Sequence, residues 1–264
     1  MKIVVVIPTY RERENIGRLI PELFDQFTQL NTHKFQILVV DDKSPDGTGE
    51  VVKNLASKHK NIHLLVGRKQ GLGAAYIRGF DYALNALKAG VVVEMDADFS
   101  HQPKELPLLI EEIENGADFV IGSRYVKGGR VPKNWNFFRR ANSRWGNRFA
   151  RYIAGIDNVR DCTSGYRAIK RRVLEKINLK KLKVKGYSFQ MNLLYEAFRK
   201  GAKIKEVPIH FKERKWGHTK IGLTDIIEFM WNSVKLRFRQ GFWPKRRPRL
   251  FKTIIPQTRK ARYN

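Results

Sequence analysis

Short apolar segments alternate with amphipathic ones over the first half of the chain, and this alternation restricts the fold more than any other feature. The apolar segments are short and rich in valine and isoleucine, which is typical of buried strands. The segments between them carry apolar residues at helical spacing. Strands are predicted at residues 2–8, 35–40, 62–66, 91–95 and 119–122, and helices at 15–30, 49–58, 74–87 and 103–115. This order predicts an α/β fold with a mostly parallel central sheet flanked by helices.

The composition fits a globular protein without disulfides. The chain has 264 residues, 42% of them hydrophobic, which is enough to bury a sizeable core. Cys162 is the single cysteine, so an intramolecular disulfide and a metal site made of cysteines alone are both excluded. We expect a reducing compartment and a buried or half-buried Cys162 that is not a nucleophile.

No signal peptide or transmembrane helix is predicted. The N-terminal apolar run, residues 3–7, ends at Pro8 and is too short for a signal sequence. The longest later candidate, residues 223–242, is interrupted by five charged residues. A membrane-spanning helix needs about 20 predominantly apolar residues, so we expect that this chain does not cross a bilayer.

Acidic residues gather where two predicted strands end. Asp41 and Asp42 follow one apolar run, and Asp96 and Asp98 follow another. In open α/β sheets, ligands bind beyond the carboxyl ends of the strands. Two carboxylates one residue apart can hold Mg²⁺ or Mn²⁺, which share their other ligand positions with substrate phosphates. The pattern therefore indicates either a metal–diphosphate site or a group of solvated turn aspartates.

A dinucleotide-binding domain is the alternative α/β interpretation. It requires Gly-x-Gly-x-x-Gly directly after the first strand. The first glycine of this chain is Gly17, well beyond that point, and Gly71 and Gly73 lack a third glycine at the required spacing. A nicotinamide or flavin enzyme is therefore not expected.

Further motifs follow one another in a fixed order along the chain. They are Pro8-Thr9-Tyr10-Arg11-Glu12, Asp41-Asp42-Lys43-Ser44, Gly71-Leu72-Gly73, Met95-Asp96-Ala97-Asp98-Phe99-Ser100, Gly122-Ser123-Arg124-Tyr125, Thr163-Ser164-Gly165-Tyr166-Arg167, Gly186-Tyr187-Ser188-Phe189-Gln190-Met191 and Glu206-Val207-Pro208-Ile209. In this order they resemble the family 2 glycosyltransferases with the GT-A nucleotide-sugar-binding fold, and among these the polyprenol-phosphate mannosyltransferases. The resemblance extends over residues 2–240. It implies a catalytic domain over residues 1–222, followed by an amphipathic helix and a basic aromatic tail over 223–264.

The resemblance also implies roles for individual residues. Asp98 is the expected metal carboxylate, with Asp96 and Ser100 beside it, and the metal is Mg²⁺ or Mn²⁺. Arg139 and Ser143 match positions near the acceptor phosphate, and Asp98, Arg124, Arg139 and Ser143 form the expected catalytic set. The residues expected to contact the nucleotide sugar are Pro8, Tyr10, Glu12, Val40, Asp42, Asp96, Ala97, Asp98, Ser100, Arg124, Arg214 and Lys220.

Four positions depart from the usual motifs of this family. Arg11 replaces an Asn, Lys43 stands where a small residue is usual, Asn192 occupies a position often held by Glu, and Thr219 replaces a Ser. None of these changes removes an expected metal carboxylate or a phosphate-facing cation. They bear on sugar and acceptor preference.

The implied reaction transfers mannose from GDP-mannose to a polyprenyl phosphate of the dolichyl type, with inversion, to give polyprenyl-phosphate β-mannose for glycan or glycoprotein assembly. No general base is required, because a phosphate monoester already carries about −1.5 to −2 charge at pH 7. Two alternatives are retained: a related transferase that uses another donor such as UDP-glucose, and a nucleic-acid-binding protein, suggested by charge alone.

Positive charge is concentrated in the second half of the chain. Residues 1–123 carry 14 Lys+Arg and 17 Asp+Glu, whereas residues 124–264 carry 38 and 8, so the second half accounts for the net charge of +27. Residues 231–264 contain 11 Lys+Arg, no acidic residue and several aromatic residues. A basic amphipathic helix with aromatic residues suits an anionic membrane surface; a packed helix with a solvated tail is the alternative. We expect a peripheral protein on the cytoplasmic face of a membrane, held by this surface or by a separate membrane-anchoring subunit, without nucleic acid as a functional partner.

Overall fold

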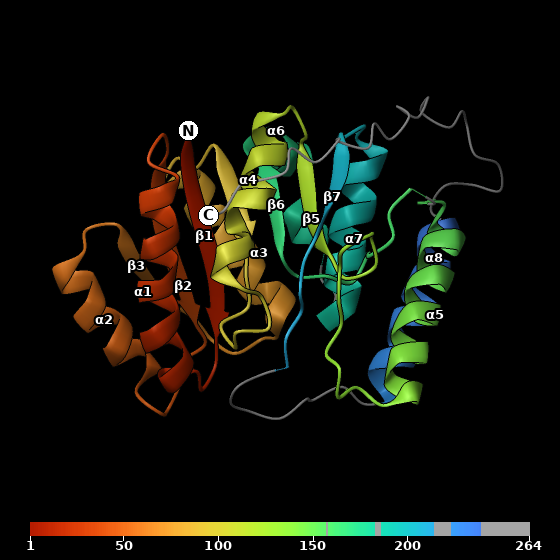
Figure 1. Cartoon of the computed structure of the whole chain (residues 1–264), viewed down its shortest axis with the longest axis horizontal. Coiled ribbons are helices and arrows are strands. Elements are labelled where there is room, and N and C mark those ends of the chain that lie inside the picture. Colours follow the sequence, from red (N-terminus) through yellow and green to blue (C-terminus); the bar gives the residue numbers. More distant parts are fainter. Residues whose placement is uncertain (157, 183–185, 214–222, 239–264) are drawn as a thin grey trace, which may run out of the picture.

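The computed structural model describes residues 1–156, 158–182, 186–213 and 223–238 (Figure 1). The strands are β1 (Lys2–Thr9), β2 (Lys34–Asp41), β3 (Ile62–Val66), β4 (Val91–Glu94), β5 (Phe119–Ser123), β6 (Arg167–Lys170) and β7 (Ile204–Pro208). The α-helices are α1 (Arg13–Gln29), α2 (Thr48–Lys58), α3 (Leu72–Asn85), α4 (Leu106–Glu114), α5 (Phe137–Ala154), α6 (Arg171–Glu175), α7 (Gly186–Arg199) and α8 (Leu223–Phe238). Two short 3₁₀ helices are η1 (Pro103–Glu105) and η2 (Leu179–Lys181).

The described strands form one sheet in the order β3-β2-β1-β4-β6-β5-β7. β1 pairs in parallel with both β2 and β4, and β5 pairs in parallel with β7. β6 lies between β4 and β5 and is antiparallel to both. The carboxyl ends of all strands except β6 therefore meet at one edge of the sheet, the lower edge in Figure 1.

Each face of the sheet is covered by its own helices. Val4 and Val6 face a core shared with α3 and α5 to α8, whereas Ile3, Val5 and Ile7 face a core shared with α1, α2 and α4. This division follows from the strand geometry, because successive side chains point to opposite faces. α5 and α8 pack side by side at one end of the sheet (Figure 1).

The predicted α/β fold is confirmed, with every predicted strand and helix present and small differences at their ends. The largest difference lies at residues 103–115, where one helix is predicted. The structure has the 3₁₀ helix Pro103–Glu105 followed by the α-helix Leu106–Glu114. Two prolines, at 103 and 107, explain the change, because proline lacks an N–H and restricts the residue before it. None of the described helices combines the length and apolar character needed to cross a membrane.

Candidate active site

The two acidic pairs predicted from the sequence lie on the same edge of the sheet. Asp41 ends β2 and Asp96 follows β4, and these two strands flank β1. Thr9, at the end of β1, donates its hydroxyl to the Asp41 carboxylate at 2.9 Å. The parallel pairing of β1 with both neighbours thus brings together three strand ends that are far apart in the sequence.

The loops after these strands contain left-handed backbone at residues other than glycine. Arg11 (φ 61°) follows β1, Lys43 (φ 51°) follows β2 and Phe99 (φ 62°) follows β4. Asparagine and glycine adopt this conformation at lower cost than long or bulky side chains. One departure from the family motifs, Arg11 in place of an Asn, therefore falls at a position where the backbone favours the usual residue, and Lys43 adopts the same unfavourable conformation. Strained conformations of this kind cluster at functional sites.

The loops after β1 and β2 are joined to each other by hydrogen bonds. The backbone N–H of Arg11 donates to the Ser44 hydroxyl at 3.0 Å, and the N–H of Glu12 donates to the Thr48 hydroxyl at 3.0 Å. Ser44 in turn donates its N–H to Asp41 at 2.9 Å. Asp41 thus organises this loop pair.

The predicted nucleotide residues lie along this loop pair and the adjoining strand ends. Pro8 and Tyr10 are half-buried, and the Lys69 ammonium lies 3.4 Å from the centre of the Tyr10 ring. The Val40 side chain is fully buried, so only its backbone can contact a ligand.

Asp42 forms a partly buried ion pair with Arg78 of α3. Burial raises the pKa of Asp42, and the neighbouring Arg78 charge opposes this rise only in part. Arg78 is not among the predicted site residues. Its helical segment carries no local signal of a binding role, so only the packing of α3 against the sheet reveals it.

The expected metal ligands are held in a defined arrangement at the end of β4. Asp98 is buried and accepts the backbone N–H of Ser100 at 3.0 Å. Asp96 is more exposed; its N–H donates to Nδ1 of His101 at 3.1 Å, and its carboxylate accepts the Tyr76 hydroxyl at 3.5 Å.

The oxygen donors at this position fit a hard divalent cation. Within the described residues, no group of three or more His, Cys, Asp or Glu side chains could hold a metal ion. Mg²⁺ commonly uses one or two carboxylates together with substrate phosphates, and Asp96 and Asp98 can supply that number. The two carboxylates therefore suit a divalent cation whose other ligands would come from a bound diphosphate.

Arg124, directly after β5, is tightly held by a buried carboxylate. Its Nε and Nη2 donate to Asp161 at 2.8 and 2.7 Å, and Nη2 also donates to the Thr163 hydroxyl at 2.6 Å. Arg124 and Asp161 are both buried. The loop that carries Asp161 also reaches Asp96, because the position of a Cβ at Gly165 would lie 3.8 Å from the Asp96 carboxylate.

The predicted acceptor residues lie on α5. The Ser143 hydroxyl is hydrogen-bonded to that of Tyr125, whose ring lies 5.3 Å from the Arg124 guanidinium. Arg139, one turn earlier, forms an exposed ion pair with Glu213 at 3.1 Å. The structure therefore links Ser143 to Arg124 through Tyr125, while Arg139 pairs with a carboxylate at the rim. Arg214 and Lys220 lie outside the described residues.

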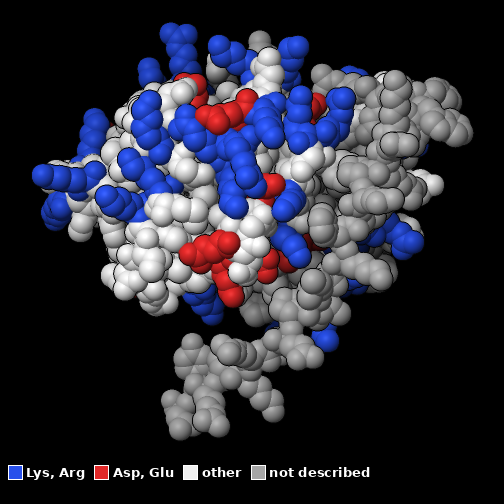
Figure 2. Space-filling model, turned by 90° about the horizontal axis from the view of Figure 1, so that it is seen from above, with Lys and Arg blue, Asp and Glu red and all other residues white. Residues whose placement is uncertain are grey.

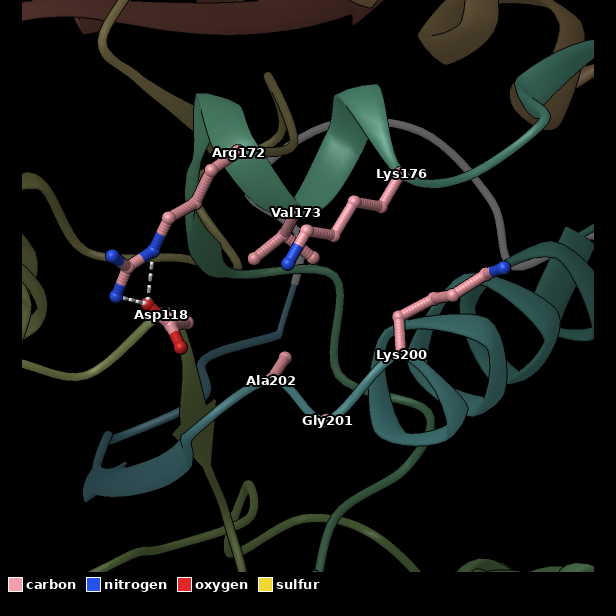
Figure 3. A pocket seen from close by; sticks show the side chains of 7 residues that line it. All are labelled: Asp118, Arg172, Val173, Lys176, Lys200, Gly201 and Ala202. Atoms are coloured by element: carbon pink, nitrogen blue, oxygen red, sulfur yellow. Dashed lines mark hydrogen bonds and ion pairs between the residues drawn. The ribbon is translucent and has the colours of Figure 1, made fainter.

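A small hollow lies at the opposite edge of the sheet (Figure 3). Its lining residues are Asp118, Arg172, Val173, Lys176, Lys200, Gly201 and Ala202. Asp118 precedes β5, whereas Arg124 follows it, so the hollow is separated from the predicted site by the length of that strand. Figure 2 views the molecule from above, toward this opposite edge, where lysine and arginine side chains predominate and acidic groups interrupt them. The hollow contains none of the predicted site residues.

The sequence matches Glycosyl transferase family 2 over residues 4–178, and the chain belongs to this family. It is 44% identical over 238 residues to the polyprenol monophosphomannose synthase of Mycolicibacterium smegmatis, which covers 89% of this chain and 87% of that protein. It is 41% identical over 222 residues to the undecaprenyl-phosphate mannosyltransferase of Micrococcus luteus, which covers 84% of this chain and 88% of that protein. The similarity to polyprenol-phosphate mannosyltransferases that the motifs indicate is thereby confirmed.

Solved structures share the fold at lower identity. The glucosyl-3-phosphoglycerate synthase of Mycobacterium tuberculosis, in complex with Mn²⁺, UDP and glucosyl-3-phosphoglycerate, has a TM-score of 0.62 at 18% identity, covering 89% of this chain and 78% of that one. A mannosyltransferase from Pyrobaculum calidifontis, in complex with GDP-Man and Mn²⁺, has a TM-score of 0.54 at 16% identity, covering 89% and 69%. The predicted GT-A fold is confirmed.

Proposed function

We propose that this protein transfers mannose from GDP-mannose to a polyprenyl phosphate and requires Mg²⁺ or Mn²⁺. The observation that carries the proposal is that an acidic pair, Asp96 and Asp98 after β4, lies at the same sheet edge as Arg124 after β5. The names of the two relatives support the lipid acceptor and the sugar. The GDP-Man and Mn²⁺ complex of the structural neighbour supports the donor and the metal class.

The reaction is a single displacement at the anomeric carbon. An oxygen of the acceptor phosphate forms the new bond to this carbon as the bond to the GDP diphosphate breaks, and the bonding electrons leave with GDP. One inline step inverts the configuration and gives a β-linked product from an α-linked donor. The bound cation would neutralise the charge that develops on the leaving diphosphate.

Residues on the two sides of the site have different tasks in this proposal. Asp98, Asp96 and Ser100 would hold the metal, and the nucleotide would lie along the loops after β1 and β2. Arg124 would meet the diphosphate, while Arg139 and Ser143 would receive the acceptor phosphate. Arginine suits these positions because its guanidinium stays charged and binds phosphate through two parallel hydrogen bonds. The arginines also reduce the repulsion between the two anionic substrates.

A transfer assay with radiolabelled donors tests the function. Wild-type protein is given GDP-mannose or UDP-glucose, a polyprenyl phosphate, and Mg²⁺, Mn²⁺ or a chelator. We expect labelled lipid from GDP-mannose with metal present and none with chelator. Asp98→Asn should abolish transfer, while the control Asp118→Asn, at the opposite sheet edge, should retain it. Labelled lipid from UDP-glucose alone would reject the donor, and no labelled lipid from either donor would reject the function.

We further propose that α5 and α8 contact an anionic membrane surface. Phe138, Trp145 and Tyr152 follow one another at seven-residue intervals on α5 and are 80%, 68% and 74% exposed. α5 also carries five arginines and no acidic residue. On α8, Trp231 and Phe238 are exposed as well. Exposed aromatic residues among cationic ones are typical of helices that lie in a membrane interface. The proposed surface would therefore extend beyond the 223–264 segment expected from the sequence.

Vesicle binding tests this surface. Trp145→Ala combined with Tyr152→Ala should weaken cosedimentation with vesicles that contain anionic lipid, whereas Leu108→Ala, an exposed apolar residue on α4, should not. Neutral vesicles should bind less protein, because each basic residue contributes about 1 kcal/mol near an anionic surface. Unchanged binding of the double variant would reject this aromatic stripe and assign the vesicle contact to another surface, such as the basic tail at residues 239–264. No binding of the wild-type protein would reject direct membrane contact and favour a separate membrane-anchoring subunit.

A further inference from the structure

Asp161 is a buried charge that the expected catalytic set does not include. It lies in the segment between α5 and β6 and is fully buried. Its carboxylate accepts three hydrogen bonds from Arg124, namely from the backbone N–H at 3.0 Å and from Nε and Nη2 of the guanidinium. Burial alone would raise the pKa of Asp161, but the charge and hydrogen bonds of Arg124 lower it below its ordinary value. Asp161 is therefore the ionised partner of this arginine.

The Asp161 loop is itself fixed from two directions. Glu206 of β7 accepts the backbone N–H groups of Arg160 and Asp161 at 2.7 and 2.9 Å. Asn147 of α5 accepts the N–H of Cys162 at 2.9 Å and donates to the Thr163 hydroxyl at 3.1 Å. The carboxylate that holds Arg124 therefore belongs to a rigid frame built from β7, α5 and the loop.

Arg124 occupies a central position because of this frame. Its guanidinium lies 5.3 Å from the ring centres of both Tyr125 and Phe211. On one side, Tyr125 contacts Ser143, a predicted acceptor residue. On the other side, the loop that carries Asp161 borders Asp96 through Gly165. An arginine fixed here lies between the two groups of residues that would hold the two phosphates.

Stability alone gives a poor reason for such a pair. Burying an ion pair costs desolvation energy that its attraction often fails to exceed, and well-packed apolar residues can serve as well. Fixed geometry, in contrast, matters greatly to a side chain that stabilises charge in the transition state. A side chain that is already in place does not have to be reoriented during the reaction, so no free energy is lost to that step. We propose that Asp161 is a positioning residue that holds the Arg124 guanidinium in place between the donor diphosphate and the acceptor phosphate. This inference rests on the proposed function.

A double-mutant cycle tests the role of Asp161. The variants are Asp161→Asn, Arg124→Lys and the two combined, assayed for kcat, for KM of the donor and for GDP affinity in the presence of Mn²⁺. Asp161→Asn keeps the shape and one acceptor oxygen but removes the charge and the second acceptor. We expect kcat to fall about tenfold to a hundredfold, as small misplacements of catalytic groups produce. Arg124→Lys should cause a similar loss, because lysine cannot use the same fork.

The combined variant separates positioning from general structural damage. If Asp161 acts through Arg124, Asp161→Asn should change the activity of Arg124→Lys by no more than about twofold. Multiplied losses in the combined variant, or wild-type activity in a folded Asp161→Asn, would overturn the proposal. The matched control is Asp118→Asn, which removes a carboxylate paired with Arg172 at the other end of β5 and should leave kcat unchanged.

Two further measurements cover the remaining outcomes. If Asp161→Asn does not fold, as shown by circular dichroism, Arg124→Gln combined with Asp161→Asn removes both charges together. Its activity is compared with that of Arg124→Gln alone. Activities equal within about twofold support a role that acts through Arg124, whereas a further loss on adding Asp161→Asn, or full activity of the combined variant, would overturn the proposal. If wild-type protein binds GDP but makes no lipid product, the proposed acceptor is rejected. The role of Asp161 is then decided by the GDP affinities of the same variants, Asp161→Asn, Arg124→Lys and the two combined. If wild type neither binds GDP nor transfers sugar, both proposals are rejected.

Discussion

Gly79 marks the point at which α3 approaches the sheet most closely. A Cβ at this position would lie 2.5 Å from Cγ1 of Val6 and 3.0 Å from Cγ2 of Val40. Carbon atoms in favourable contact are about 3.5–4.0 Å apart, so Gly79→Ala requires α3 to withdraw by roughly 1 Å or the valines to move. Both valines are fully buried on central strands, and β-branched side chains have few alternative rotamers.

The expected loss of stability follows from two opposing terms. Overpacking of a buried site costs about 1–3 kcal/mol, and the stiff neighbours favour the upper part of that range. Alanine in place of glycine within a helix returns about 1 kcal/mol. We therefore expect Gly79→Ala to lower the free energy of unfolding by about 1–2 kcal/mol, with a Tm decrease of about 2–4 °C for each kcal/mol.

The same displacement should reach the proposed donor site. α3 carries Tyr76, which contacts Asp96, and Arg78, which pairs with Asp42. Withdrawal of the helix would loosen both contacts, so GDP affinity should fall together with stability. Urea denaturation followed by circular dichroism measures the first effect, and calorimetric titration with GDP and Mn²⁺ measures the second.

Gly17→Ala on α1 is the matched control. Its Cβ would lie 3.5 Å from Cγ1 of Val51, which is an ordinary contact. This variant should gain up to about 1 kcal/mol from helix propensity and keep its GDP affinity. A Gly79→Ala protein as stable as wild type, or one that gains as much as Gly17→Ala, would refute the close approach of α3 to the sheet.

Three further predictions concern stability and reactivity. Lys43→Gly should raise the free energy of unfolding by up to about 1 kcal/mol by relieving a left-handed backbone, whereas Lys53→Gly, inside α2, should lower it by about 1 kcal/mol. Asp118→Asn should have a lower free energy of unfolding than wild type at pH 7. The pKa of Asp118 is lowered in the folded protein, because hydrogen bonds from the Lys203 N–H and Arg172, with the charge of Arg172, outweigh burial. Denaturation at a series of pH values should therefore show the full difference in stability above pH 3.8 and its loss as the pH falls below that value. Burial raises the pKa of Cys162 to about 12, so a thiol reagent should label it at pH 8 only after unfolding.

The sequence was sufficient to predict, for a physical reason, that the acidic residues lie at one edge of the sheet. Short strands with buried valines and isoleucines, separated by amphipathic helices, leave few ways to build the sheet other than in parallel. Parallel pairing then places Asp42, Asp96 and Asp98 at one edge without any further information. The exact loop conformations could not be predicted, because long side chains at Arg11 and Lys43 give no sign of left-handed backbone.

The arginine side of the site could not be derived from local patterns. Arg124 and Asp161 are far apart in sequence, and their contact depends on β6 entering the sheet between β4 and β5 in antiparallel orientation. Asp161 is surrounded by polar and small residues that also suit an exposed loop. Its burial follows only from the tertiary packing of α5 and β7 around it, so sequence patterns alone give no signal for its role.

α5 shows why the exposed aromatic stripe could not be predicted from the sequence. Aromatic residues on an amphipathic helix usually indicate its buried face, yet here Ala150 and Ala154 are buried and Trp145 and Tyr152 are exposed. The small residues allow α5 to lie close to the rest of the protein, so the aromatic stripe is left outside. Ser143 lies on the inner side of the same helix, against Tyr125. We infer that a single helix presents both the proposed lipid-facing stripe and the acceptor residues, which would place the phosphate of a membrane-embedded acceptor next to Arg124.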